Sequence, residues 1–112
     1  MFTLETENIQ LTGQVAIVTG GGRGIGRAIA LALAKAGMRV TVAARSRDQL
    51  DETVALVQQQ GGQALSFVLD VTDHSAVGQM VVETEQKFGP IDLLVNNAAI
   101  SGDLAPLWEN DA

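Results

Sequence analysis

The sequence predicts an α/β fold, a doubly wound parallel sheet with helices on both faces. Short apolar runs of strand length alternate with longer segments in which apolar residues recur at helical spacing. The connections between these segments are short, and the first apolar run passes through a group of glycines directly into a helical pattern. Strands that alternate with helices in this way require right-handed crossovers, and their strands run parallel.

The first strand is expected at residues 15–19, which are apolar almost throughout, as in a strand covered on both faces. The first helix is expected at residues 24–36, and Gly37 is a typical residue to end it. The buried stripe of this helix is predicted to consist of Ile25, Ile29, Ala32, Leu33 and Ala36.

The second strand is expected at residues 39–44. Ser46, with Gln49 three residues later, fits a capping box, so a second helix should follow and continue to about Gln60. Its inner face is predicted to consist of Leu50, Val54 and Val57.

The third strand is expected at residues 64–69. After a turn at residues 70–73, a third helix should run to Phe88, where Gly-Pro at residues 89–90 ends it. The fourth strand is expected at residues 91–95. The resulting β-α-β-α-β-α-β succession predicts the strand order 3-2-1-4, which brings the carboxyl ends of the first and fourth strands together at the switch point.

The glycines between the first strand and the first helix belong to residues 19–26, Thr-Gly-Gly-Gly-Arg-Gly-Ile-Gly. Glycines let a backbone approach a ligand closely, and a helix start offers unpaired N–H groups to an anion. A Walker-type loop is excluded, because Arg27 and Ala28 stand where that loop needs lysine and serine or threonine. The pattern Thr-Gly-x-x-x-Gly-x-Gly instead favours a dinucleotide site in a Rossmann-type fold. A tight turn without a ligand is the alternative.

Composition excludes several other classes of function. The 112 residues carry a net charge of −6 and no basic run, which argues against nucleic acid as a partner. No cysteine is present, and the single histidine, His74, has no partner cluster for a metal and is expected in an exposed helical turn. No signal peptide or membrane-spanning stretch is visible, so we expect no membrane partner and a cytoplasmic location.

With Asp70-Val71 and Asn96-Asn97-Ala98-Ala99 also in place, the sequence resembles the short-chain dehydrogenase/reductase family, as its N-terminal cofactor-binding half. It is similar to members such as 3-oxoacyl carrier-protein reductases, from residue 11 to about residue 111. One departure is that the family's Asn-Asn-Ala-Gly is Asn-Asn-Ala-Ala here.

The resemblance implies a role for each matching position. Gly20, Gly24 and Gly26 would line the pyrophosphate, with Arg23 and Ile25 between them. Asp70 would bind the adenine amino group, and Val71 would lie beside the ring. Asn97 would tie the fourth strand to its neighbours, Ala98 would face the adenosine ribose, and Ile100 would lie near the nicotinamide. The structural alternatives are a helix cap for Asp70 and a turn amide for Asn97.

The charges near the second strand favour NADP(H) over NAD(H). A site for NAD usually ends this strand with an acid, but here Ala44 is followed by Arg45. Arg45 could meet a 2′-phosphate, with Arg23 approaching from the other side, whereas Arg47 is a weaker candidate on the first turn of a helix. The alternative is that Arg45 and Arg47 lie on a solvated loop and Arg23 on a solvent-facing turn, without binding a phosphate. The predicted cofactor-binding residues are Thr19, Gly20, Gly22, Arg23, Gly24, Ile25, Gly26, Arg45, Asp70, Val71, Asn97, Ala98, Ala99 and Ile100.

No catalytic residue can be assigned. The family uses a Tyr-x-x-x-Lys pair with an upstream serine and an asparagine, and this chain contains no tyrosine. Lys35 and Lys87 fall on the first and third helices, Ser101 comes too early, and Asn110 falls short of the helix that bears the family's asparagine.

We therefore expect residues 1–112 to form a single NADP(H)-binding domain, with residues 1–10 as a flexible leader and the sheet truncated after its fourth strand. The chain alone should be inactive. A complete reductase would act on a small carbonyl or alcohol substrate and form a homo-oligomer. One alternative is a non-catalytic NADP(H)-binding module. Another is a methyl-donor-binding transferase, although that class expects an acid where Ala44 and Arg45 stand.

Overall fold

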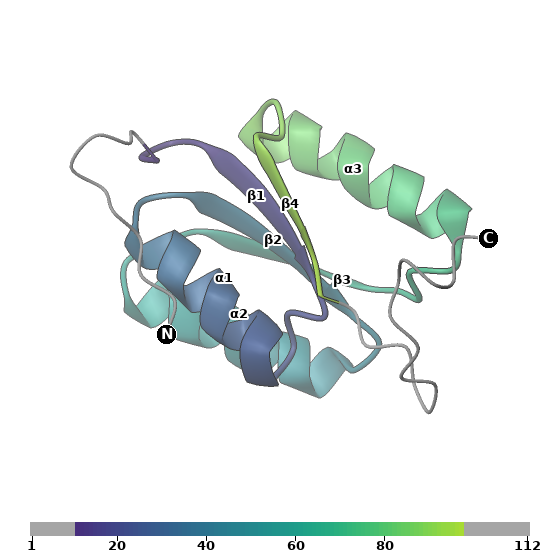
Figure 1. The fold of residues 1–112 in the computed structure, drawn as a ribbon, viewed down its shortest axis with the longest axis horizontal. Coiled ribbons are helices and arrows are strands. Elements are labelled where there is room, and N and C mark those ends of the chain that lie inside the picture. The colour runs from purple at the N-terminus through teal and green to yellow at the C-terminus, as the bar shows by residue number, and fades with distance from the viewer. Residues whose placement is uncertain (1–10, 98–112) are drawn as a thin grey trace.

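The computed structural model describes residues 11–97, which form a four-stranded parallel sheet with three helices (Figure 1). The strand order is β3-β2-β1-β4, so the predicted fold class and strand order are confirmed. The elements are β1 (Val15–Thr19), α1 (Gly24–Lys35), β2 (Arg39–Ala44), α2 (Arg47–Gln59), β3 (Ala64–Val68), α3 (His74–Phe88) and β4 (Leu93–Asn96).

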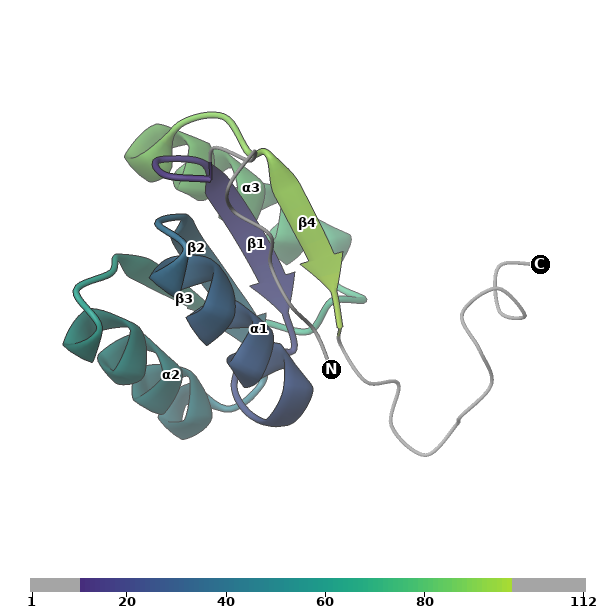
Figure 2. The ribbon, with the colours of Figure 1, turned by 60° about the vertical axis from the view of Figure 1, so that its left-hand side comes forward.

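The helices cover both faces of the sheet. Helices α1 and α2 lie side by side on one face, and α3 lies on the other (Figures 1 and 2). Side chains alternate between the two layers, because successive residues of a strand point to opposite faces. Ala16 and Val18 of β1 belong to the core under α1 and α2, whereas Ile17 packs with Met80 of α3. Every residue of β1 is buried, as its apolar sequence predicted.

The fourth strand starts two residues later than expected. The Asp92 carboxylate accepts a hydrogen bond from the Val15 amide at 2.9 Å, and the Asp92 amide donates to the Val15 carbonyl at 2.8 Å. These contacts fasten the entry to β4, and the strand itself begins at Leu93. It extends to Asn96, which pairs with Thr19.

The buried face of α1 matches the prediction at Leu33, and Ile29 is partly buried against the core, but Ile25 differs from the prediction. Ile25 is 71% exposed, and the buried residues of the helix are Gly26, Ala30, Leu33 and Ala34. The helix is rotated so that its small residues face the sheet and α2, which leaves Ile25 at the mouth of the cleft described below. For α2 the prediction was closer, because Leu50 and Val57 are buried and Val54 is partly buried.

None of the helices between residues 11 and 97 combines the length and apolar character that crossing a bilayer would require.

Candidate nucleotide-binding site

A cleft of about 970 Å³ lies at the carboxyl ends of the strands. It is built from the turn after β1, the ends of β2 and β4, and the segment after β3. Its lining residues are Gly20, Gly22, Arg23, Gly24, Ile25, Ala43, Ala44, Arg45, Ser46, Gln49, Leu69, Asp70, Val71, Thr72, Asn96 and Asn97. A cleft at this position and of this size suits a dinucleotide.

The turn at residues 20–24, called the glycine turn below, depends on glycine at particular positions. Gly20 and Gly24 have φ values of 70° and 58°, in the left-handed region that favours glycine. A Cβ atom on Gly26 would lie 1.9 Å from the Gly20 carbonyl oxygen, so only glycine lets α1 start this close to the turn. The close approach places Gly24 and Ile25, the first residues of α1, in the lining of the cleft.

The start of α1 differs from the starts of the other two helices. Ser46 caps α2 by accepting from the Gln49 amide, and Asp73 caps α3 by accepting from the Ala76 amide. The N-cap residue of α1 is Arg23, whose side chain makes no capping hydrogen bond, and the first turn of α1 has no acid. An uncapped helix N-terminus of this kind suits an anion such as a pyrophosphate.

Thr19 and Gly26 support the cleft without lining it. The Thr19 hydroxyl donates to Asn96 Oδ1 at 3.0 Å and accepts from the Asn97 amide at 3.0 Å. These bonds tie the end of β4 to the end of β1. The Asn97 side-chain amide also lies near Gly26, where a Cβ atom would come within 3.0 Å of it. The Asn97 side chain therefore lies beside the start of α1, while its backbone amide is bonded to β1.

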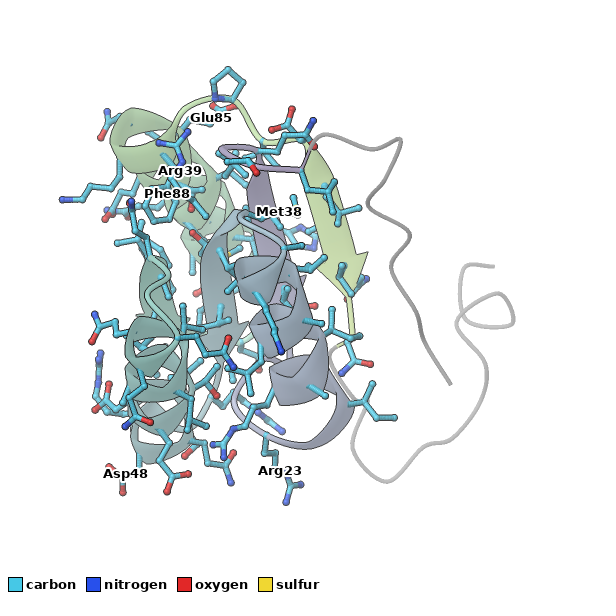
Figure 3. The ribbon with its side chains drawn as sticks, turned by 90° about the vertical axis from the view of Figure 1, so that its left-hand side faces the viewer. Arg23, Met38, Arg39, Asp48, Glu85 and Phe88 are labelled. Carbon is cyan, nitrogen blue, oxygen red and sulfur yellow. The ribbon has the colours of Figure 1, made fainter. Side chains whose placement is uncertain are left out.

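The charged residues of the cleft are two exposed arginines and one aspartate. Arg23 projects from the carboxyl end of the sheet (Figure 3), and Arg45 follows β2 directly. The amide and hydroxyl of Thr72 donate to Asp70 Oδ1 at 2.9 and 2.8 Å. These two bonds, with a smaller contribution from Arg45, lower the pKa of Asp70 below its ordinary value. Asp70 is therefore ionised at neutral pH, with one oxygen engaged by Thr72.

The structure brings nine of the predicted site residues together in the cleft, from four separate segments of the chain. Ala98, Ala99 and Ile100 lie outside the described residues. Sequence reasoning missed the other seven lining residues, which are Ala43, Ala44, Ser46, Gln49, Leu69, Thr72 and Asn96. Ser46 and Gln49 were identified only as a capping box. The position of Thr72, two residues after Asp70 in a turn, was the available signal for an Asx-type hydrogen bond.

Comparison with known proteins agrees with this geometry. The family model described as short chain dehydrogenase matches residues 14–111. The chain is 45% identical over 104 residues to a short chain dehydrogenase/reductase, astE, of Aspergillus oryzae, covering 92% of this chain and 40% of that protein. It is 48% identical over 94 residues to a 3-oxoacyl-[acyl-carrier-protein] reductase of Synechocystis, covering 83% of this chain and 38% of that protein.

The chain thus spans about 40% of the length of these two relatives. A third relative is covered more fully. A short-chain dehydrogenase/reductase homolog, YusS, of Bacillus subtilis is 42% identical over 94 residues, which cover 83% of this chain and 86% of that protein.

Solved structures share the fold. NAD⁺-bound xylitol dehydrogenase superposes with a TM-score of 0.80 at 39% identity, over 89% of this chain and 38% of that one. A variant of actinorhodin polyketide ketoreductase with NADPH superposes with a TM-score of 0.76 at 38% identity, over 82% of this chain and 35% of that one.

Proposed function

The chain belongs to the short-chain dehydrogenase family, and we propose that it is the NADP(H)-binding region of an oxidoreductase that transfers hydride between NADP(H) and a carbonyl or alcohol substrate. Proteins of this family use NAD(P) and act on small molecules. The bound nicotinamide supplies or accepts the hydride. The residues of this chain bind the nucleotide, orient it and select between its 2′-hydroxyl and 2′-phosphate forms.

The observation that carries the choice of NADP(H) is the pair of arginines at the adenosine side of the cleft. Arg45 lines the cleft directly after β2, where an acid would bind the ribose hydroxyls of NAD and repel a phosphate. Arg23 lines the same cleft from the glycine turn. A guanidinium that contacts a phosphate makes a charge-assisted hydrogen bond, which is stronger than a bond between neutral groups.

Asp70 supports an adenine site rather than a ribose site. It follows β3, one strand away from β2, and the cleft places it beside Val71 and Leu69. A carboxylate accepts only, so it suits an exocyclic amino group, and the two apolar side chains suit the face of a ring. In this arrangement Asp70 does not occupy the position from which an acid would exclude a 2′-phosphate.

The residues that complete the reaction in this family are a Tyr-x-x-x-Lys pair and a serine, and the 112 residues contain no tyrosine. We therefore propose that the chain binds NADP(H) without catalysing the reduction alone. We propose separately that a complete reductase forms a homo-oligomer. The absence of tyrosine also favours the second candidate function, a non-catalytic NADP(H)-binding module. The cytoplasmic location stays a prediction from the sequence.

The test is a fluorescence titration of the protein with NADPH and with NADH, repeated with Arg45→Asp. We expect NADPH to bind more tightly than NADH, and Arg45→Asp to weaken NADPH by about 10- to 100-fold, since one charge-assisted bond contributes about 1.5–3 kcal/mol. NADH should bind the variant as tightly as the wild type or more tightly. Lys35→Asp is the control, because it makes the same charge change at the far end of α1.

Two outcomes would contradict the proposal in different ways. Tighter binding of NADH than of NADPH would assign the cleft to NAD(H), and equal affinities unchanged by Arg45→Asp would show that the arginines do not select the 2′-phosphate form. If neither nucleotide binds at high micromolar concentration, the binding function itself is wrong. Reduction of a carbonyl compound by the protein alone would contradict the prediction that the chain does not catalyse the reaction by itself.

A further inference from the structure

Arg27 lies in α1 near the cleft, but its guanidinium reaches across to α2 and is not part of the cleft lining. Its Nε donates to Thr53 Oγ1 at 3.0 Å. One terminal nitrogen lies 2.9 Å from Glu52 Oε1 and 3.1 Å from the Gln49 carbonyl oxygen. The same nitrogen donates to the Gly22 carbonyl. One side chain thus joins the glycine turn to α2.

Thr53 binds the same turn from inside α2. Its side chain is fully buried, and its hydroxyl oxygen lies 2.8 Å from the Gly21 carbonyl oxygen and 3.2 Å from that of Gly22. A hydroxyl that accepts from the Arg27 Nε keeps its own proton free to donate. Thr53 and Arg27 together therefore satisfy the carbonyls of two successive peptide groups of the turn.

Fixing these carbonyls also fixes the amides that follow them. In a trans peptide the C=O of one residue and the N–H of the next point in opposite directions. With the Gly21 and Gly22 carbonyls held toward α2, the amides of Gly22 and Arg23 point away from it. Gly22 and Arg23 both line the cleft. The amides of Gly20 and Gly21, in contrast, donate to the Ala43 carbonyl of β2 at 2.7 and 3.3 Å, so they are already hydrogen-bonded to the sheet.

The glycine turn is also packed closely against β2 and α2. A Cβ atom on Gly21 would lie 2.9 Å from the Val42 Cβ, and one on Gly22 would lie 3.1 Å from the Gln49 Cβ. A segment with three successive glycines has many accessible conformations, and ordering it on binding would cost affinity. Contacts that order it beforehand remove that cost.

We infer that Arg27 and Thr53 are positioning residues for the dinucleotide, an inference that rests on the proposed function. They hold the glycine turn against α2 so that the Gly22 and Arg23 amides face the pyrophosphate, and they do not touch the nucleotide themselves. Because α2 directly follows the segment with Arg45, the same contacts also fix the position of the glycine turn relative to Arg45, on the adenosine side of the cleft.

The experiment compares variants that keep or remove the contacts. Thr53→Val removes the hydroxyl at nearly constant volume, and Thr53→Ser keeps it. Arg27→Lys keeps the charge but loses the planar group that reaches several acceptors. Each variant is titrated with NADPH and with adenosine 2′-monophosphate, which has no pyrophosphate. We expect the Kd for NADPH to rise about tenfold in Thr53→Val and Arg27→Lys, equivalent to about 1.4 kcal/mol.

Adenosine 2′-monophosphate should lose clearly less affinity than NADPH, at most about threefold, because Arg45, Asp70 and Val71 lie outside the glycine turn and only Arg23 belongs to it. Thr53→Ser should retain the NADPH affinity. Thr84→Val is the matched control for threonine, because Thr84 is also fully buried in a helix and its hydroxyl pairs with that of Thr41 at 2.9 Å. Arg39→Lys is the matched control for arginine, at the opposite end of the molecule from Arg23 (Figure 3). Both controls should lower stability and leave the NADPH Kd unchanged.

A loss of affinity shared equally by both ligands would overturn the inference, because it would indicate general damage to the fold. A second readout needs no ligand. Backbone ¹⁵N order parameters at Gly22 and Arg23 should fall from about 0.85 to below about 0.6 in Thr53→Val. Unchanged order parameters would also overturn it. If the wild type binds no NADPH, the proposed function fails, while the order parameters still decide whether Arg27 and Thr53 hold the turn.

Discussion

At the scale of single residues, the glycines of this chain meet very different surroundings. Gly26 lies where a Cβ atom would be 1.9 Å from the Gly20 carbonyl oxygen and 2.6 Å from its carbon. These are backbone atoms, which cannot move aside as the end of a flexible side chain could. Gly78 lies within α3, and a Cβ atom there would have no neighbour within 4 Å. The first glycine is required by packing, whereas the second only adds freedom to the unfolded chain.

Alanine substitutions should therefore have opposite effects at these two positions. Gly78→Ala is expected to raise the free energy of unfolding by about 0.5–1 kcal/mol, because alanine has the higher helix propensity. Gly26→Ala is expected to lower it by more than about 2 kcal/mol and to displace α1 from the glycine turn. Urea denaturation of both variants tests this. A Gly26→Ala protein as stable as the wild type would show that the turn can move without cost.

At the scale of elements, the three helices share one direction relative to the sheet but differ at their starts. Side chains cap α2 and α3, through Ser46 and Asp73. The start of α1 has Arg23 at the N-cap position, without a capping bond. An N-cap that accepts no hydrogen bond forgoes about 1 kcal/mol of stability. In a cleft that receives an anion, the same amides gain a partner when the ligand binds, so the start of α1 is arranged for binding rather than for stability.

Arg23→Asp should therefore stabilise the protein and weaken binding. The aspartate would cap α1 and complement its dipole, which we expect to add about 1 kcal/mol to the free energy of unfolding. The same carboxylate would repel a phosphate, so the NADPH Kd should rise more than tenfold. Thermal unfolding and NADPH titration measure the two effects.

Arg23→Ala is the control, because it removes the guanidinium without supplying a cap. It should weaken binding less than Arg23→Asp and should not stabilise the protein. If Arg23→Asp left the melting temperature unchanged, the amides at the start of α1 would have another partner.

At the scale of the whole molecule, the core is unevenly distributed across the sheet. The central strands β1 and β2 are buried almost throughout, whereas β4 at the edge is mostly exposed (Figure 2). Leu93 is 39% exposed and Leu94 is 62% exposed. Within residues 11–97, β4 pairs only with β1, so its other edge presents free backbone groups beside exposed leucines. Such an edge is a template for pairing with another chain.

We expect the 112-residue protein to self-associate with rising concentration, and Leu94→Lys to reduce this association. A charge on the edge strand hinders pairing between sheets. Sedimentation velocity over a range of concentrations measures the effect. Val82→Lys is the control, because Val82 is 51% exposed but lies on α3 rather than on the sheet. An equal reduction by both variants would assign the association to general surface hydrophobicity.

The sequence by itself determined the order of the elements, the glycine turn and the family. The apolar run at residues 15–19 and the β-branched run at residues 39–44 became β1 and β2 with the expected bounds. The strand order was also predictable, because short connections and right-handed crossovers leave few arrangements. These features depend on residues that are close together in the chain, where spacing and turn chemistry act directly on the local backbone.

Only the tertiary structure decided which face of α1 is buried and what holds the glycine turn. Ile25 was predicted both in the buried stripe of this helix and among the cofactor-binding residues, and the rotation of the helix decides in favour of the cleft. Thr53 is 32 residues from the Gly21 carbonyl that it binds, and Thr19 is 77 residues from Asn96. Contacts at such separations depend on how helices and strands pack once the sheet has formed. Because periodicity describes one element at a time, it cannot specify them.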